Sequence, residues 1–304
     1  MVRAWLKFSL TMLKVFFVLI LLNFTSGFTP VVLWHGMGDS CCNPLSLGRL
    51  MKVIKAEMPG VYVKSLRIGK DIIEDTENGY FMNVNLQVLE ACKQIKNDTF
   101  LQNGYNAIGF SQGAQFLRAV AQRCPSGMKK LISIGGQHQG VYGLPKCLPP
   151  KHKLCEYLRY LLDKGAYWSW VQDQFVQAEY WHDPIREEVY RERSYFLADI
   201  NNERFFNTTY RQGLVSLQKF VMVMFEKDTM VIPKESEWFG FYTPGQAKEI
   251  TELTSSRIYL DPEDKLGLRE MNLGGKLDFI SLPTDHLQFH EDWFVDTIIY
   301  GYLK

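Results

Sequence analysis

Short hydrophobic runs alternate along much of the chain with longer segments whose apolar residues recur at helical spacing. The runs predict buried strands, because each is only four to seven residues long and turn-forming or polar residues flank them. They cover residues 30–34, 61–66, 105–108, 130–134, 219–225 and 276–280. The helical spacing is found in residues 45–58, 82–96, 114–120 and 293–300. This alternation predicts an α/β fold, with a mostly parallel central sheet and helices on both of its faces.

The alternation breaks between residues 137 and 218. This segment has several prolines, many aromatic residues and amphipathic helical stretches, but no hydrophobic run of the same kind. We therefore expect a helical insertion that covers the functional site of the protein as a cap. Its apolar residues have a simple explanation as a small core of the insertion itself. Alternatively they enclose a long hydrocarbon chain, with Trp34 and Trp181 as candidate lining residues.

The N-terminus has the layout of a secretory signal peptide. Three basic residues precede or flank the apolar run 15–22, and small and polar residues follow it up to Gly27. We predict a signal peptide over residues 1–27 and a single domain over residues 28–304. The alternative is an uncleaved membrane anchor, which is less favoured because a span needs about 20 apolar residues. The secretory route predicts a lysosomal or secreted protein without a stable transmembrane anchor.

The cysteines and the glycosylation motifs agree with that route. The six cysteines are an even set, as expected for disulfides in an oxidising compartment: Cys41, Cys42, Cys92, Cys124, Cys147 and Cys155. Six cysteines allow 15 pairings, and the pattern does not choose among them. Asn97 and Asn207 each begin an Asn-x-Thr acceptor for N-glycosylation.

Charge and cysteine spacing limit the range of partners. The formal net charge of +1 disfavours nucleic acid as a partner. No two cysteines have the Cys-x-x-Cys spacing of a zinc or redox site. We therefore expect no metal and no cofactor.

Residues 109–113, Gly-Phe-Ser-Gln-Gly, are the most informative about chemistry. They form a Gly-x-Ser-x-Gly motif between the predicted strand 105–108 and the predicted helix 114–120. In α/β-hydrolases this motif is a sharp turn that holds a nucleophilic serine clear of the sheet. Glycines flank the serine because larger side chains would collide with the neighbouring strand and helix. The motif predicts Ser111 as a nucleophile.

A serine nucleophile needs a histidine base and an acid that orients this base. In α/β-hydrolases they follow the serine in the order acid, then histidine, and each comes after a strand. Asp228 follows the run 219–225, and His286 follows the run 276–280. Asp285 is a poor alternative acid because neighbouring side chains diverge; Asp261 and Asp264 are the remaining alternatives.

Two backbone N–H groups are expected to bind the oxyanion of the intermediate. One belongs to Gln112, directly after the serine at the start of a helix. For the other we choose Met37, in the glycine-rich turn after the first strand. This turn is similar to the His-Gly motif of lipases and esterases, and we interpret His35 as structural. The alternative is that the turn is only a strand exit.

Longer strings then identify a resemblance. They are LWHGMGDSCCNP (33–44), GFSQG (109–113), IGGQHQGV (134–141), YWHDP (180–184), FLADIN (196–201), SEWFGFY (236–242) and DHLQ (285–288). With them the chain resembles the palmitoyl-protein thioesterase family, lysosomal α/β-hydrolases that remove fatty acyl groups from S-acylated proteins. The resemblance covers residues from about 30 to 303 and is to the type 1 branch of the family.

The resemblance implies the same triad and oxyanion donors as those derived above. It also implies that the insertion forms most of the acyl groove. The disulfides that it implies are Cys41–Cys42, Cys92–Cys124 and Cys147–Cys155.

We expect hydrolysis of long-chain acyl thioesters on proteins or peptides, through an acyl-enzyme, during lysosomal degradation. The triad cannot separate this activity from that of a secreted lipase or carboxylesterase, because all use the same machinery. The substrate class rests on the resemblance and on the apolar insertion. A catalytically silent hydrolase-fold binding protein is a further alternative, disfavoured because such relatives usually lack the serine or the histidine.

Overall fold

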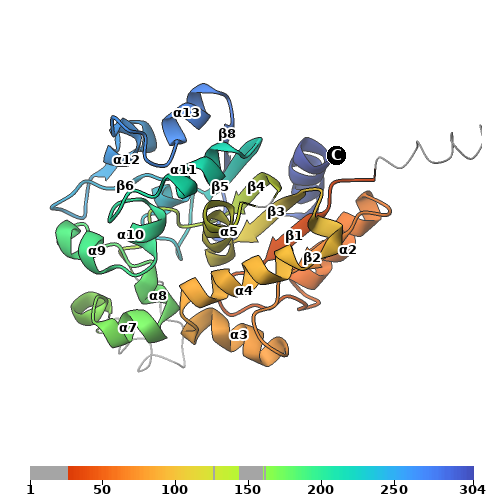
Figure 1. Ribbon diagram of the computed structural model, residues 1–304, viewed down its shortest axis with the longest axis horizontal. Helices are drawn as coiled ribbons and strands as arrows, with labels where there is room; N and C mark the ends of the chain where they lie inside the picture. Colours follow the sequence, from red (N-terminus) through yellow and green to blue (C-terminus); the bar gives the residue numbers. More distant parts are fainter. Residues whose placement is uncertain (1–26, 126, 144–159, 161) are drawn as a thin grey trace, which may run out of the picture.

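The computed structural model describes residues 27–125, 127–143, 160 and 162–304. A six-stranded parallel sheet runs through the centre, in the order β2-β1-β3-β4-β5-β8 (Figure 1). Its strands are β1 (Val31–Trp34), β2 (Val63–Ser65), β3 (Tyr105–Phe110), β4 (Met128–Ile134), β5 (Lys219–Phe225) and β8 (Leu277–Leu282). Each predicted hydrophobic run contributes one strand. The predicted α/β class with a mostly parallel central sheet is confirmed.

Helices cover both faces of the sheet. Successive residues of a strand point to opposite faces, and β1 shows the consequence. Val31 and Leu33 belong to one buried cluster, together with α2 (Leu47–Glu57) and the C-terminal helical segments. Val32 and Trp34 belong to a second buried cluster on the other face, together with α4 (Val84–Lys96) and α5 (Gln112–Arg123). The C-terminal segments are α14 (Glu291–Trp293) and the π-helical η4 (Phe294–Leu303).

The strand order places a crevice at one end of the sheet. From β1 the chain passes outward to β2, and it then returns to β3 on the other side of β1. Ligands of open α/β sheets bind at such a reversal, beyond the carboxyl ends of the strands. The turns after β1 and β3 meet there.

Helix α3 (Ile72–Phe81) has no counterpart among the predicted elements. A start signal for it is present, because the Asp71 side chain accepts hydrogen bonds from the N–H groups of Ile73 and Glu74. The apolar pattern hides the helix, since Ile72 and Ile73 are exposed to solvent by 50% and 71%. α3 carries Asp75, which becomes important at the site.

The segment between β4 and β5 is helical where it is described. Its helices are α7 (Ser169–Gln174), α8 (Val176–Glu179), α9 (Glu187–Arg193), α10 (Leu197–Ile200) and α11 (Thr208–Val215). The last two lie on α5: Gln122 donates to the Ile200 carbonyl at 2.6 Å, and Arg123 donates to the Tyr210 hydroxyl at 3.1 Å. α8 lies beside α3 instead (Figure 1), and the rings of Phe81 and Phe175 meet edge to face.

A second excursion, which the sequence pattern did not predict, separates β5 from β8. It contains η2 (Lys234–Trp238), the two-stranded antiparallel sheet of β6 (Phe241–Tyr242) and β7 (Ile250–Thr251), η3 (Leu253–Ser255), α12 (Arg257–Leu260) and α13 (Leu268–Leu273). The remaining short helical turn is η1 (Thr99–Leu101). Of these elements, η2 packs directly on β5 and so lies near the site.

Two disulfides are present in the described residues. Cys41–Cys42 lies in the turn after β1, and Cys92–Cys124 ties α4 to the end of α5. Both agree with the pairing that the resemblance implies. Cys147 and Cys155 lie outside the described residues, as do residues 1–26 of the predicted signal peptide.

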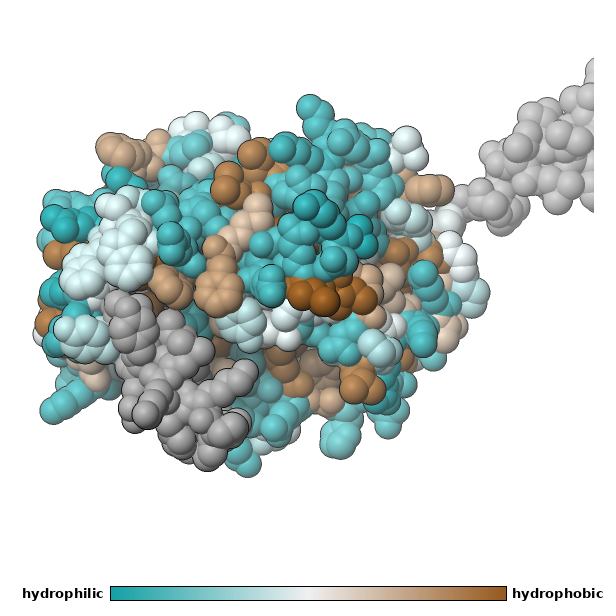
Figure 2. Space-filling model, turned by 90° about the horizontal axis from the view of Figure 1, so that it is seen from below, coloured by the Kyte–Doolittle hydropathy of each residue, from teal (hydrophilic) through white to brown (hydrophobic). Residues whose placement is uncertain are grey.

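Surface polarity is mixed on the face drawn in Figure 2. Hydrophobic side chains interrupt the polar surface there in several separate places. Scattered apolar side chains of this kind are ordinary on folded proteins. Across the described ranges, no helix has the length and hydrophobicity needed to cross a membrane.

Candidate active site

Ser111 occupies the turn between β3 and α5. Its φ of 52° and ψ of −125° are rarely adopted by residues with a side chain. A Cβ atom on Gly113 would overlap the carbonyl oxygens of Trp34 and His35, and one on Gly109 would overlap the backbone of Ala114. The Gly-x-Ser-x-Gly motif therefore folds as the sharp strand-to-helix turn expected of it.

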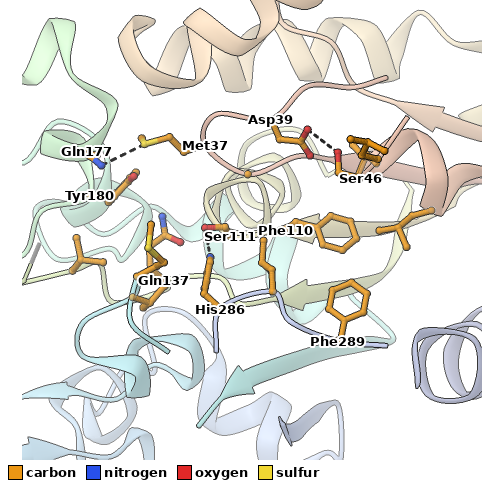
Figure 3. A pocket seen from close by; sticks show the side chains of 18 of the residues that line it. Met37, Asp39, Ser46, Phe110, Ser111, Gln137, Gln177, Tyr180, His286 and Phe289 are labelled. Atoms are coloured by element: carbon orange, nitrogen blue, oxygen red, sulfur yellow. Dashed lines mark hydrogen bonds between the residues drawn. The ribbon is translucent and has the colours of Figure 1, made fainter. Parts of the chain in front are cut away.

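The histidine and the acid predicted from strand order meet at this serine. His286 follows β8, and its Nε2 lies 2.9 Å from Ser111 Oγ; Figure 3 shows the two side chains pointing toward each other. His286 Nδ1 lies 2.5 Å from Oδ2 of Asp228, which follows β5. The Asp228 side chain is fully buried, and that of His286 is 11% exposed. The three side chains form one continuous chain of hydrogen bonds.

Asp228 is held as an ionised carboxylate. Its Oδ1 accepts the N–H groups of Met230 and Val231, both at 2.7 Å. Burial raises the pKa of Asp228, but hydrogen bonds and the charge of His286 outweigh burial, so the net pKa lies below its usual value. An ionised acid at this position can fix the imidazole and stabilise it when it carries a proton.

The alternative acids have other contacts. Asp285 accepts from the N–H and the hydroxyl of Thr229, at 2.9 and 3.0 Å. Asp264 accepts from the N–H groups of Arg269 and Glu270 at the start of α13. Asp261 accepts from the N–H of Glu263 in an exposed turn. Among the aspartates considered, the structure brings Asp228 to His286 Nδ1.

The predicted oxyanion donors flank the serine. The N–H of Gln112 is at the first position of α5, where a helix leaves its N–H groups without helical partners. Met37 lies in the turn after β1, next to Gly36, where an added Cβ would be only 3.1 Å from Ser111 Cβ. The turn thus approaches the serine closely, and Met37 lines the cavity above it. The Met37 sulfur accepts from Gln177 Nε2 at 3.4 Å (Figure 3).

His35 and Asp75 support this turn from behind. His35 is 2% exposed, and its Nε2 lies 3.1 Å from Oδ1 of the fully buried Asp75. Asp75 also accepts the N–H groups of Ile68, at 2.6 Å, and of Cys41, at 2.8 Å. These contacts join the turn after β1 to helix α3. The interpretation of His35 as structural agrees with its position.

A cavity of about 510 Å³ opens at Ser111 and His286. This volume is in the range of small-molecule sites. Figure 3 shows Met37, Gln177 and Tyr180 on one side of the Ser111–His286 pair, and Phe110 and Phe289 on the other. The apolar residues that line the cavity are Met37, Leu45, Leu47, Leu50, Phe110, Val141, Leu162, Tyr180, Trp181, Met230, Val231, Leu287 and Phe289.

The two tryptophans expected in the groove have different positions. Trp181 lines the cavity, and its ring lies 5.3 Å from that of Tyr142. Trp34 is 1% exposed, packs edge to face on Phe116 and is not part of the cavity wall. The expectation for Trp34 was therefore wrong: it is the last residue of β1, and the alternation along the strand turns its side chain into the core.

Comparison with known proteins gives the family. A family model described as palmitoyl protein thioesterase matches residues 30–286. The chain belongs to this family. It is 52% identical over 274 residues to palmitoyl-protein thioesterase 1 of Caenorhabditis elegans, covering 90% of this chain and 91% of that protein. As a palmitoyl-protein thioesterase family member, it is a hydrolase of the thioester-cleaving class.

More distant similarities extend over most of the chain. It is 27% identical over 279 residues to lysosomal thioesterase PPT2 of Bos taurus, covering 90% of this chain and 85% of that protein. Among solved structures, a Bacillus licheniformis lipase aligns with a TM-score of 0.46 and 12% identity, covering 92% of this chain and 93% of the lipase.

One residue of this thioesterase site was not anticipated. Glu237, in η2, is fully buried, and it forms with Asp228 and His286 a group whose potential ligand atoms all lie within 4.8 Å. Within that group, the 2.5 Å between Asp228 and His286 is a hydrogen-bond distance, too short for two ligands of one metal ion. No local sequence signal connects Glu237 to the triad, since contact depends on how η2 packs against β5.

Proposed function

We propose that this enzyme hydrolyses long-chain fatty acyl thioesters, such as palmitoyl groups on cysteines of proteins or peptides. Ser111 Oγ attacks the thioester carbonyl while His286 Nε2 takes its proton. The N–H groups of Met37 and Gln112 bind the oxyanion that develops. Asp228 orients the imidazole and stabilises its protonated form.

The intermediate then collapses to an acyl-enzyme. The carbon–sulfur bond breaks, and His286 passes its proton to the departing sulfur, which leaves as a cysteine thiol. A cysteine thiol has a pKa of about 8.5, so its departure needs less acid assistance than that of an alcohol. Water then attacks the acyl-serine while His286 takes its proton, the fatty acid leaves, and the proton returns to Ser111.

The cavity supports a long acyl chain as substrate. Its wall is mainly aliphatic and aromatic on both sides of the Ser111–His286 pair. Each methylene of the acyl chain that is buried there contributes about 0.8 kcal/mol. Shortening the chain by four methylenes is then expected to cost about 3 kcal/mol, or roughly 100-fold in kcat/KM.

We assign residues 137–218 of the domain 28–304 to a helical cap that forms part of this groove. In support, Val141, Leu162, Gln177 and Tyr180 of this segment line the cavity. The end of the segment has a second role, since α10 and α11 pack on α5.

We infer a lysosomal or secreted location, reached by cleavage of residues 1–27. One support is the similarity to a relative named as lysosomal. Another is that Asn97 and Asn207 are both exposed, so that glycans can be attached there. The disulfides Cys41–Cys42 and Cys92–Cys124 also suit an oxidising compartment.

The observation that carries the proposal is the hydrogen-bonded series Ser111–His286–Asp228 at the base of an apolar cavity. The direct test is incubation of the purified protein with a palmitoyl-cysteine peptide and a matched palmitoyl-serine peptide, at neutral and mildly acidic pH. We expect rapid release from the thioester only, and no release by Ser111→Ala.

Two alternatives give different results in that assay. A lipase or carboxylesterase would release palmitate from both peptides at similar rates. A catalytically silent binding protein would release it from neither, and Ser111→Ala would then change nothing.

A further inference from the structure

Glu237 is a buried carboxyl group beside the proposed triad. Its side chain is fully buried in η2, directly against the end of β5. Oε2 accepts the N–H of Phe225 at 3.0 Å. Oε1 is also buried, and no donor among the described residues hydrogen-bonds to it. The group lies with Asp228 and His286 in a set of side-chain atoms no more than 4.8 Å apart.

The charges around Glu237 favour its neutral form. Burial raises its pKa well above the ordinary value, and contact with the Asp228 carboxylate raises it further. Glu235, on the same turn, acts in the same direction, while the Phe225 N–H acts against it. Asp285, beside His286, adds another acid near Asp228. Two facing carboxylates are stable at such a distance when they share one proton.

The two residues that flank Glu237 in the chain hold it in this position through hydrogen bonds of their side chains. On one side of it, Ser236 Oγ donates to the Gly140 carbonyl at 2.6 Å and accepts the Gln139 N–H at 3.0 Å. On the other side, Trp238 Nε1 donates to the Met222 carbonyl in β5 at 2.9 Å. The turn is therefore fixed to both β5 and the loop after β4, so Glu237 has little freedom to turn away from Asp228.

We propose that Glu237, as a neutral carboxylic acid, donates a hydrogen bond to Asp228 and thereby acts as a positioning residue for the triad. The proposal rests on the proposed function, because it assigns Asp228 to His286 as its acid. The donated hydrogen bond spreads the negative charge of Asp228, and this makes the protonated form of His286 less favourable. His286 then remains available as a base at lower pH, which suits an enzyme of an acidic compartment.

The test compares Glu237→Gln with Glu237→Met. Glutamine can make the same two hydrogen bonds as a neutral Glu237, because its amide oxygen can accept from the Phe225 N–H while its own N–H donates to Asp228. Methionine is similar in size but donates nothing. Glu235→Gln is the matched control, since it removes a carboxylate from the same turn without touching Asp228. Correct folding of each variant is checked by thermal unfolding.

The readout is the rate at which a long-chain alkyl fluorophosphonate labels Ser111 between pH 4 and pH 9. For Glu237→Gln and the control we expect rates within about 3-fold of the original, with the acid limb of the profile unchanged. For Glu237→Met we expect about 10-fold slower labelling and an acid limb about 1 pH unit higher, as a lost hydrogen bond to a charged group predicts.

Two outcomes would overturn the proposal. An acid limb that moves to lower pH in Glu237→Gln would show that Glu237 is charged, and this variant decides the matter even if Glu237→Met does not fold. A folded Glu237→Met with an unchanged acid limb would show a purely structural role. A failure of the proposed function looks different: the unsubstituted protein would not be labelled at any pH, or Ser111→Ala would be labelled equally.

Discussion

Replacing Asp75 with asparagine is expected to reduce both activity and stability, and more strongly at acid pH. The carboxylate accepts three hydrogen bonds in the interior: from His35 and Ile68 on Oδ1, and from Cys41 on Oδ2. Asparagine has one acceptor oxygen, so at least one of these donors must face an amide NH₂ group. The turn after β1, which contains Met37 and is the proposed oxyanion turn, lies between two of the three contacts.

The size of the effect follows from burial. A buried donor left without a partner costs about 1–3 kcal/mol, and breaking a buried ion pair costs about 3–5 kcal/mol. We expect the free energy of unfolding to fall by about 2 kcal/mol at pH 8 and about 4 kcal/mol at pH 5. If the turn moves and one oxyanion donor is lost, kcat falls by about 10²-fold to 10³-fold.

The pH dependence comes from His35. Burial lowers its pKa, but the hydrogen bond and charge of Asp75 outweigh burial, so the net pKa in the folded protein is raised. The ion pair therefore contributes its full stability below about pH 6.5, the value for an unperturbed histidine, and loses it as pH rises through the folded pKa. In the asparagine variant burial still disfavours protonation of His35, and only the smaller effects of the Gly36 carbonyl and of Asp39 oppose it. The difference between the two proteins must then grow as pH falls.

Denaturant unfolding at pH 5, 6.5 and 8 measures this difference, and thioester turnover at the same pH values measures kcat. Glu77→Gln is the matched control, because Glu77 is an exposed acid on the same helix. A loss of stability that is equal at all three pH values would refute the role given to the His35–Asp75 pair. An unchanged kcat in a folded variant would refute its link to the oxyanion turn.

Three further predictions concern the sharp turn at Ser111 (the elbow), the proposed acyl groove and the buried acid Glu179. Gly113→Ala should abolish thioester turnover and lower expression of folded protein, because the new Cβ overlaps two backbone carbonyl oxygens; a folded, active variant would contradict the close packing of the elbow. Trp181→Ala should lower kcat/KM about 10-fold for a palmitoyl thioester and far less for a butyryl thioester, because Trp181 lines the cavity. Trp170→Ala, outside that wall, should lower neither, and equal losses for both substrates in Trp181→Ala would argue against an acyl contact. Glu179→Gln should raise the free energy of unfolding by about 1 kcal/mol or more at pH 7.5 and hardly at pH 4, because burial raises the pKa of Glu179 and the folded protein keeps a proton that the unfolded chain loses as pH rises. Denaturant midpoints at the two pH values measure this, with exposed Glu188→Gln as control, and an equal gain at both would be inconsistent with a neutral Glu179.

The sequence predicted the features that depend on short stretches of chain. Each strand of the sheet corresponds to a hydrophobic run, and the glycines of the elbow indicated where the backbone turns sharply. The order of serine, acid and histidine follows from the strand order, because each of the three residues comes directly after a strand. The structure brings Ser111, His286 and Asp228 within hydrogen-bond distance, while their catalytic roles stay predictions for the peptide assay.

Features that depend on packing were missed or misplaced. Trp34 was expected in the groove because it ends a strand near the site, yet strand alternation turns it into the core. Helix α3 was missed because its first two residues are exposed and apolar, although Asp71 marks its start. The run of helices and short strands between β5 and β8 has no clear period, so neither η2 nor its buried Glu237 could be predicted.

The features that the sequence did not predict have one physical cause, which is that their positions depend on tertiary packing. The groups proposed to touch substrate lie directly after strands, so their positions follow from the sheet and can be inferred from the order of the chain. Asp75 and Glu237 come from α3 and η2, elements between the strands whose positions depend on tertiary packing. Each is a fully buried carboxyl group behind a proposed catalytic group, one behind the oxyanion turn and the other behind Asp228. The two carboxyl groups have partners of opposite charge. Asp75 faces a histidine whose pKa it raises, whereas Glu237 faces a carboxylate that favours the neutral form of Glu237. Acidification from pH 8 to pH 5 therefore strengthens the first contact and leaves the second intact, which would keep both supports of the site in place in an acidic compartment.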